Sequence, residues 1–391
     1  MFRFRLSVFL LGLVVLLGAV GAVAAADLTN ACRQDLAQRL KLDVAEITVA
    51  KTETVTWPNA ALGLERPDKV YADMLTSGLR LELQARRGTY YYHTSDKRFS
   101  YAGRAEMWNA SALYLMPIED EPNLNGTLVQ VSLLGTNPRD LLKGVSDFAP
   151  QADGSVLATR RTSRSGFDLL YLAPDARGEA KILTGAFEFA RPVLAPQGGQ
   201  YAVFSRQLVG RSWGVERGAL DGPPSDLPVL PVAGQPVALT WGEYAGLQAT
   251  VRVDHNLARF NLVEKDGTAT WAPAGTTPEM PHAWSVMLNK SFSLVAKTTG
   301  AGTPHPVTRV YMESFQGDQS DIASLDDFQM DRCELSPDMG FVLLVGQRDA
   351  KSLALTVDRH TGEVLETLPQ VSGPVHLGAR PSQWEPPLKG Q

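Results

Sequence analysis

Histidine and carboxylate side chains recur where several apolar segments of the chain begin, so they are the first candidates for chemistry. His282 and His376 stand 94 residues apart, with Asp331 between them. Imidazole and carboxylate groups together suit a divalent metal ion, but a lone histidine at a strand end more often makes an ordinary hydrogen bond. We favour the second interpretation. The spacing predicts a polar ring formed by Asp147, Arg191, His282, Asp331, Arg332 and His376.

Arginines gather in loops of the first half of this region, and aspartates gather in residues 318–331. A surface with one basic and one acidic side would orient a dipolar partner or a peptide. An ordinary solvated loop surface is the alternative, and it is favoured for charged runs. We expect charge reversal at Arg160 and Arg206 together to weaken capture of a partner. The arginines of this group are Arg160, Arg161, Arg164, Arg206 and Arg211.

One string resembles a catalytic motif. Residues 210–214, Gly-Arg-Ser-Trp-Gly, satisfy the G-x-S-x-G pattern of a nucleophile elbow. That elbow requires a strand that turns sharply into a helix, and no helix is predicted after this string. A glycine-rich chain produces such matches by chance. The sequence therefore predicts no catalytic residue.

A repeat of about 46 residues must position all of these side chains. Phe148-Ala149-Pro150-Gln151 and Leu194-Ala195-Pro196-Gln197 are 46 residues apart, and Leu335-Ser336-Pro337-Asp338 follows 141 residues later. Each repeat holds four short segments with alternating apolar residues. A repeat of this length with four strands is typical of a propeller blade.

From residue 105 onward the chain resembles the TolB-type six-bladed propellers. The resemblance is carried by Ile182-Leu183-Thr184, by the run from Pro192 to Pro196, and by Leu335-Ser336-Pro337-Asp338. It implies a mainly β fold with six blades over residues 105–391. The strand predicted at 375–380 has no companions after it, so we expect it to pair with three strands within residues 112–142. Such a closure removes free sheet edges.

Residues 27–104 predict a small α+β module, with a helix over residues 31–40 capped by Asn30 and an antiparallel sheet. The strings Trp57-Pro58, Leu62-Gly63, Gly78-Leu79-Arg80-Leu81 and Tyr90-Tyr91-Tyr92-His93 resemble a module of secreted bacterial proteins with no established activity. The usual pattern of that module has a cysteine where this chain has Leu64. Alternate tyrosines are expected to face core and solvent in turn. A ligand surface at these tyrosines and His93 is the less favoured alternative.

The first 26 residues predict a signal peptide. Arg3 and Arg5 precede an apolar run, and small residues end it near Ala26, although an uncleaved anchor is long enough to span a bilayer. We expect an exported, periplasmic or extracellular protein with no other membrane contact. Removal of the segment leaves 35 basic and 42 acidic residues, a balance that does not suggest nucleic acid. Cys32 and Cys333 could pair, but two free thiols are at least as probable in a chain of this length.

Two functions remain from the sequence. The favoured one is a non-catalytic propeller that binds a protein, peptide or glycan on its loop face and needs no cofactor. The alternative is a metal-assisted hydrolase or lactonase in the channel, which would hold Ca²⁺ with converging oxygen ligands. The arginines of the predicted ring would oppose a cation. Trp241, Trp271 and Trp284 could grip a sugar, but packing between sheets is the commoner role of such residues.

Overall fold

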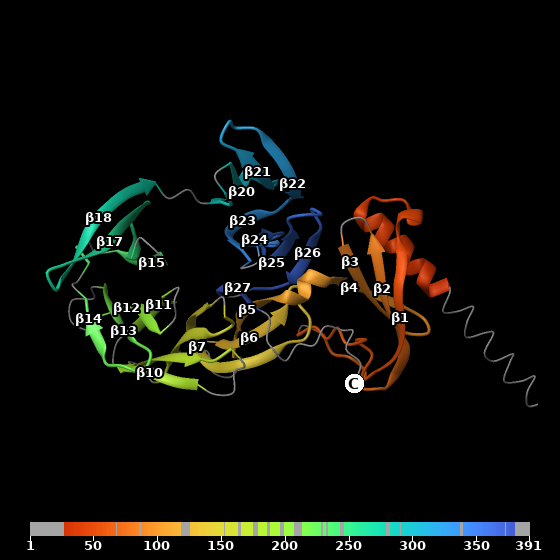
Figure 1. Ribbon diagram of the computed structural model, residues 1–391, viewed down its shortest axis with the longest axis horizontal. Coiled ribbons are helices and arrows are strands. Elements are labelled where there is room, and N and C mark those ends of the chain that lie inside the picture. The colour runs from red at the N-terminus through yellow and green to blue at the C-terminus, as the bar shows by residue number, and fades with distance from the viewer. Residues whose placement is uncertain are drawn as a thin grey trace, which may run out of the picture. The chain divides into compact units, whose positions relative to one another are not determined.

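The computed structural model divides the protein into two compact units (Figure 1). The first unit contains the described residues up to Asn109 together with Leu134–Pro138, and the second contains Ala110–Leu133 and the residues from Arg139 onward. No helix among the described residues has the length and apolar character needed to cross a bilayer. The predicted signal peptide lies outside the described residues. These are residues 27–67, 69–85, 88–118, 126–151, 153–162, 166–174, 179–185, 188–195, 199–206, 213–227, 230–231, 234–242, 246–278, 282–289, 291–336, 339–371 and 373–379.

The first unit is a helix packed on a four-stranded antiparallel sheet. The described helix covers residues 27–40, so Asn30 lies inside it and is not its N-cap as the sequence suggested. A short 3-10 helix, η1 (Val44–Glu46), leads to strands in the order β1-β2-β3-β4. Cys32, Leu36 and Ala37 of the helix pack against one face of the sheet. The strands are β1 (Thr48–Trp57), β2 (Thr76–Ala85), β3 (Gly88–Thr94) and β4 (Phe99–Arg104), followed by η2 (Ala105–Asn109).

Both faces of this small sheet are covered, which changes the expected role of the tyrosine run. Tyr90 and Tyr92 belong to the core beneath the helix. Tyr91 on the opposite face is also buried, in a cluster with Leu64 and Trp108. The expectation that alternate tyrosines meet solvent was therefore wrong. Leu64, at the position of the cysteine in the related pattern, contributes apolar packing.

His93 is a core residue at the end of β3, with only 1% of its surface exposed. Its ring stacks on Trp57 at 4.4 Å, and its Nδ1 lies 2.7 Å from the carbonyl oxygen of Leu62, to which it donates. This bond places the proton of the neutral ring on Nδ1. The buried Nε2 has no hydrogen-bond partner among the described residues. Burial lowers the pKa of His93 to about 4, because a proton on Nε2 would be both desolvated and unpaired.

We expect this histidine to make the module sensitive to acid. The pKa of His93 is about 4 in the folded protein and 6.5 in its ordinary state. Between pH 6.5 and pH 4 the unfolded chain therefore binds more protons than the folded module does. The free energy of unfolding of the module should fall by about 3 kcal/mol over this range. Urea unfolding followed by tryptophan fluorescence measures this slope. The variant H93F should flatten it, whereas H305N, at an exposed position, should keep the wild-type slope.

The described residues of the second unit form four four-stranded antiparallel sheets and one seven-stranded sheet. Together these make six blades of four strands, because two blades share one strand of the larger sheet. Each of blades two to five is a simple meander whose first strand is the innermost. Short apolar strands joined by tight turns give this pattern because a single sheet cannot bury both of its faces. Blade two is β11 (Glu188–Leu194), β12 (Gln200–Arg206), β13 (Trp213–Ala219) and β14 (Pro224–Asp226); blade three is β15 (Gln235–Gly242), β16 (Gly246–Val253), β17 (Asn256–Lys265) and β18 (Thr268–Pro278); blade four is β19 (Ala283–Met287), β20 (Phe292–Thr299), β21 (Val307–Ser314) and β22 (Gln319–Asp326); blade five is β23 (Gln329–Leu335), β24 (Phe341–Arg348), β25 (Lys351–Asp358) and β26 (Val364–Leu368).

Blades six and one share a strand and form one seven-stranded sheet, in the order β10-β9-β8-β7-β6-β5-β27. The C-terminal strand β27 lies beside β5 in antiparallel register, with Val375 opposite Tyr114 (Figure 1). The sequence suggested separate strands near 139–142 and after Asp147, but one continuous strand, β7, serves both blades. The strands are β5 (Ala110–Met116), β6 (Gly126–Ser132), β7 (Arg139–Pro150), β8 (Val156–Arg161), β9 (Phe167–Leu172), β10 (Glu179–Gly185) and β27 (Val375–Ala379).

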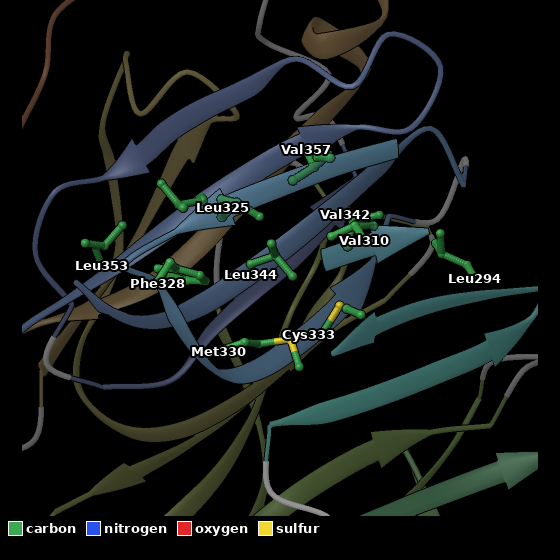
Figure 2. Packing of buried hydrophobic residues seen from close by; sticks show 13 residues of the cluster. Leu294, Val310, Leu325, Phe328, Met330, Cys333, Val342, Leu344, Leu353 and Val357 are labelled. Carbon is green, nitrogen blue, oxygen red and sulfur yellow. The ribbon is translucent and has the colours of Figure 1, made fainter. Parts of the chain in front are cut away.

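Apolar clusters hold neighbouring blades together. Figure 2 shows the cluster between blades four and five, where Leu294 and Val310 from one sheet meet Cys333 and Leu344 from the next. A second cluster joins blades two and three around Phe204 and Phe260. The tryptophans for which the sequence favoured packing between sheets lie in or against these clusters. They are Trp241, Trp271 and Trp284.

Both cysteines are free and buried, and they belong to different units. Burial raises the pKa of the Cys32 thiol to about 12 and raises that of Cys333 as well. Neither thiol is therefore an activated nucleophile at neutral pH.

Candidate functional site

The candidate site is a cavity of about 590 Å³ at the end of the blades where the innermost strands begin. We call it the channel-mouth cavity. Its lining comes from the first strands of blades one, two, three and five, from the next two strands of blade two, and from the residue before β27. It is lined by Ser146, Asp147, Glu188, Ala190, Arg191, Arg206, Trp213, Gln235, Pro236, Arg332 and Pro374.

Backbone bulges interrupt the innermost strands at equivalent points. The pairing register shifts between Val145 and Asp147 in β7 and between Met330 and Arg332 in β23. Similar shifts occur at residues 190–193 in β11 and 236–238 in β15. A bulge leaves one residue unpaired and re-aims its side chain. The innermost strands of these four blades thus present polar side chains at the same end of their sheets.

Asp147 joins blade one to blade two. Its Oδ2 accepts a hydrogen bond of 2.8 Å from the backbone N–H of Arg191, and its Oδ1 lies 3.6 Å from the Arg191 guanidinium. Arg191 has a φ of 52°, an uncommon conformation for a residue with a side chain. The carboxylate fixes this bulge by holding both the backbone and the side chain of Arg191.

A charged group of three residues joins blade five to β27, the strand that closes the ring of blades. Arg332 Nη2 lies 2.9 Å from Glu334 Oε2 and 2.6 Å from His376 Nδ1. Glu334 also accepts a 3.0 Å bond from the backbone N–H of Leu377. Burial alone would raise the pKa of Glu334, but the bond and charge of His376, the charge of Arg332 and the Leu377 N–H together lower it. Glu334 therefore stays ionised and holds β27 against β23.

His282 makes the corresponding link between blades four and five. Its Nδ1 donates to the carbonyl oxygen of Met330 at 2.5 Å and lies 3.6 Å from Asp331 Oδ1. His282 and His376 are thus each held by neighbours on β23. In the part of the chain that the structure describes, no three histidine, cysteine, aspartate or glutamate side chains come together as metal ligands would.

The structure brings only some of the predicted residues together. Asp147, Arg191, Arg206 and Arg332 line the channel-mouth cavity, and His376 contacts Arg332. His282 and Asp331 contact each other but are not among its lining residues. Arg160 and Arg161 line a separate cavity. Arg164 and Arg211 lie outside the described residues, as does most of the G-x-S-x-G string, whose last two residues begin strand β13.

The acidic side of the predicted surface is also divided. Asp318 lies in the turn between β21 and β22, whereas Asp326 and Asp327 follow at the other end of β22. Consecutive antiparallel strands place these two turns at opposite ends of the blade. The aspartates therefore do not form one acidic face, contrary to the expectation from the sequence.

Glu334 was not predicted as a member of this site. Glu334 lies two residues after Arg332 on the same strand, so both side chains lie on one face of the sheet. This spacing could have indicated from the sequence that Glu334 is a neighbour of Arg332. Glu188 was missed as well, although it lies directly opposite Arg206 in the register of β11 and β12 and pairs with it at 3.1 Å.

Comparison with known proteins finds one family model that matches the first unit and several similar solved structures. Residues 29–101 match the model of a domain of unknown function, DUF8738. No curated protein matches the sequence at a significant level. The crystal structure of TolB from Acinetobacter baumannii is similar at 10% identity, with 85% of this chain and 83% of that chain covered and a TM-score of 0.49.

Two further solved structures are similar at lower scores. A chain of the nidogen/laminin complex matches at 12% identity over 69% of this chain and 99% of its own, with a TM-score of 0.43. The propeller domain of the Trilobed protease from Pyrococcus furiosus matches at 11% identity over 57% and 70%, with a TM-score of 0.35. The protein is a six-bladed β-propeller that follows a small α+β module in the sequence. Within this chain, the sheet order and the pairing of β27 with β5 show how the blades connect.

Proposed function

We propose that this protein is an exported, non-catalytic binding propeller whose channel-mouth cavity holds an acidic peptide segment of a partner protein. The observation that supports this most is the convergence of three arginines on one cavity. The side chains of Arg191, Arg206 and Arg332 remain 41%, 38% and 34% exposed although each already contacts a carboxylate. A guanidinium has five N–H donors, so each arginine keeps donors for a ligand.

Two acidic residues, Asp147 and Glu188, line the cavity together with the three arginines. Asp147 already accepts bonds from the backbone N–H groups of Phe148 and Arg191. Glu334, which pairs with Arg332, is engaged by His376 and Leu377. The three arginines outnumber the two lining carboxylates, Asp147 and the 46% exposed Glu188, so the cavity favours an anionic ligand. Guanidinium groups bind carboxylates with specific geometry.

A peptide fits this cavity better than a glycan does. Sugar binding relies on an open aromatic face, and Trp213 is the aromatic side chain of the lining. The Arg206 guanidinium lies over the Trp213 ring, 5.8 Å from its centre, and so occupies one face of it.

The export of the protein is supported by the charged and apolar pattern of its first 26 residues.

Charge reversal in the cavity tests this proposal. Because Arg160 and Arg206 lie in different cavities, the informative pair is R191E with R206E. We expect at least a tenfold loss of affinity for a fluorescent peptide rich in Asp and Glu, measured by anisotropy at constant ionic strength. R359E with K351E, at two residues that do not line the cavity, changes the net charge by the same amount and serves as the control. Equal binding by the two double variants would reject the proposal.

A further inference from the structure

A second cavity, of about 360 Å³, lies where β7 passes from blade six to blade one. We call it the fork cavity. Residues of β7 up to Val145 pair with β6, and those from Val145 onward pair with β8, so the two partner strands diverge here. The cavity is lined by Ile118, Thr127, Lys143, Gly144, Arg160, Arg161 and Thr162.

The pairing of β7 with its two neighbours is interrupted at the fork. In the pairing of β7 with β6, Leu142 and Val145 are consecutive paired residues, so the two residues between them have no partner on β6. The pairing of β7 with β8 begins at Val145. Lys143 and Gly144 are therefore opposite no residue of either neighbour. Gly144 has a φ of 76°, which a residue with a side chain rarely adopts, and a Cβ there would lie 3.5 Å from Cγ of Arg160. Glycine thus lets the strand bend while the stem of Arg160 crosses it.

The charged residues that line the fork cavity are all basic. Lys143, Arg160 and Arg161 line it, and none of its described lining residues is acidic. Arg160 is held from behind by Asp168, which is 2% exposed and 3.7 Å away. Arg161 lies over the ring of Phe167 at 5.9 Å. Both guanidiniums are thus positioned by neighbours, which reduces the entropy that a ligand must overcome on binding.

We propose that the fork cavity binds a tetrahedral oxyanion, the phosphate or sulfate group of a small organic ester. Two guanidinium groups and one ammonium group match an anion with up to two negative charges better than they match a carboxylate ligand, which carries one. The hydroxyls of Thr127 and Thr162 add uncharged donors. The volume lies at the lower end of the range for small-molecule sites, so it leaves room for more than an inorganic anion. This site is separate from the channel-mouth cavity and does not depend on the proposed function.

Titration with inorganic phosphate and with sulfate tests the site in the whole protein. Isothermal calorimetry at constant ionic strength should show saturable binding with a stoichiometry of one, and acetate should bind at least fivefold more weakly. The double variant K143Q with R161Q should lose at least tenfold in affinity. K351Q, at an exposed lysine of β25, should bind as the wild type does. A preference for phosphate over sulfate, or the reverse, identifies the class of ester.

Three outcomes would overturn the proposal. They are acetate binding equal to phosphate binding, an affinity unchanged in the double variant, and no saturable binding at all. Because Glu119, Asp120 and Glu121 follow Ile118 in the sequence, the titration is repeated with these three residues replaced by their amides. Tighter binding in that variant would still support an anion site. The variant R191E with R206E should bind phosphate normally, which separates this test from that of the peptide cavity.

Discussion

Replacing Gly78 by alanine is expected to unfold the sheet of the α+β module while leaving the blades folded. A Cβ at Gly78 would lie 1.7 Å from the carbonyl oxygen of Thr94, a backbone atom that cannot move without displacing the end of β3. The same oxygen accepts a 2.9 Å bond from Nε1 of Trp57. Because Trp57 stacks on His93, the clash should disturb the whole of that end of the core. We expect a loss of about 3 kcal/mol or more.

Hydrogen exchange measured by mass spectrometry separates the two units in one experiment. Peptides from β1 to β4 should lose protection by about 100-fold or more in G78A, and peptides from blades two and three should not change. The control is G214A, because a Cβ at Gly214 in β13 would meet nothing closer than 3.8 Å. Wild-type protection of β2 and β3 in G78A would show that the contact is not rigid.

The sequence predicted the fold well because its signals are local. Period-two alternation and turns define each blade, and a strand left over at 375–380 requires a partner at the other end of the domain. The same reasoning separated β7 into two strands, because it placed residues 139–142 in the last blade and began the first blade near Asp147. In the structure the positive φ of Gly144 bends one strand and does not end it.

The sites were predicted less completely because their residues act across blades. Arg160 and Arg206 end the second strands of neighbouring blades, so the sequence suggested one surface. The sharing of β7 places them in different cavities. Glu334 was missed since its partners, His376 and Leu377, are more than 40 residues away. Such contacts depend on how sheets pack, which a repeat length does not specify.

Replacing Glu334 by alanine is expected to loosen β27, the strand that closes the ring of blades. The variant removes the acceptor of the Leu377 N–H and leaves Arg332 and His376 in contact without their carboxylate. Breaking a partly buried charged group of this kind costs about 2–4 kcal/mol. Exchange of amides in β27 and β5 should accelerate accordingly. E264A removes a surface ion pair with Arg217 in the same unit and should cost less than about 1 kcal/mol.

The dependence on pH distinguishes loss of the charge from loss of packing. The pKa of Glu334 in the folded protein lies below its ordinary value of 4.5, so its ionised form stabilises the fold above that pH. This contribution is lost as the pH falls from about 4.5 toward the lower, folded value. The difference in unfolding free energy between wild type and E334Q should therefore be greatest near pH 6 and should shrink below pH 4.5. A constant difference across this range would mean that Glu334 holds β27 by its shape and its bond to Leu377, and that its charge contributes little.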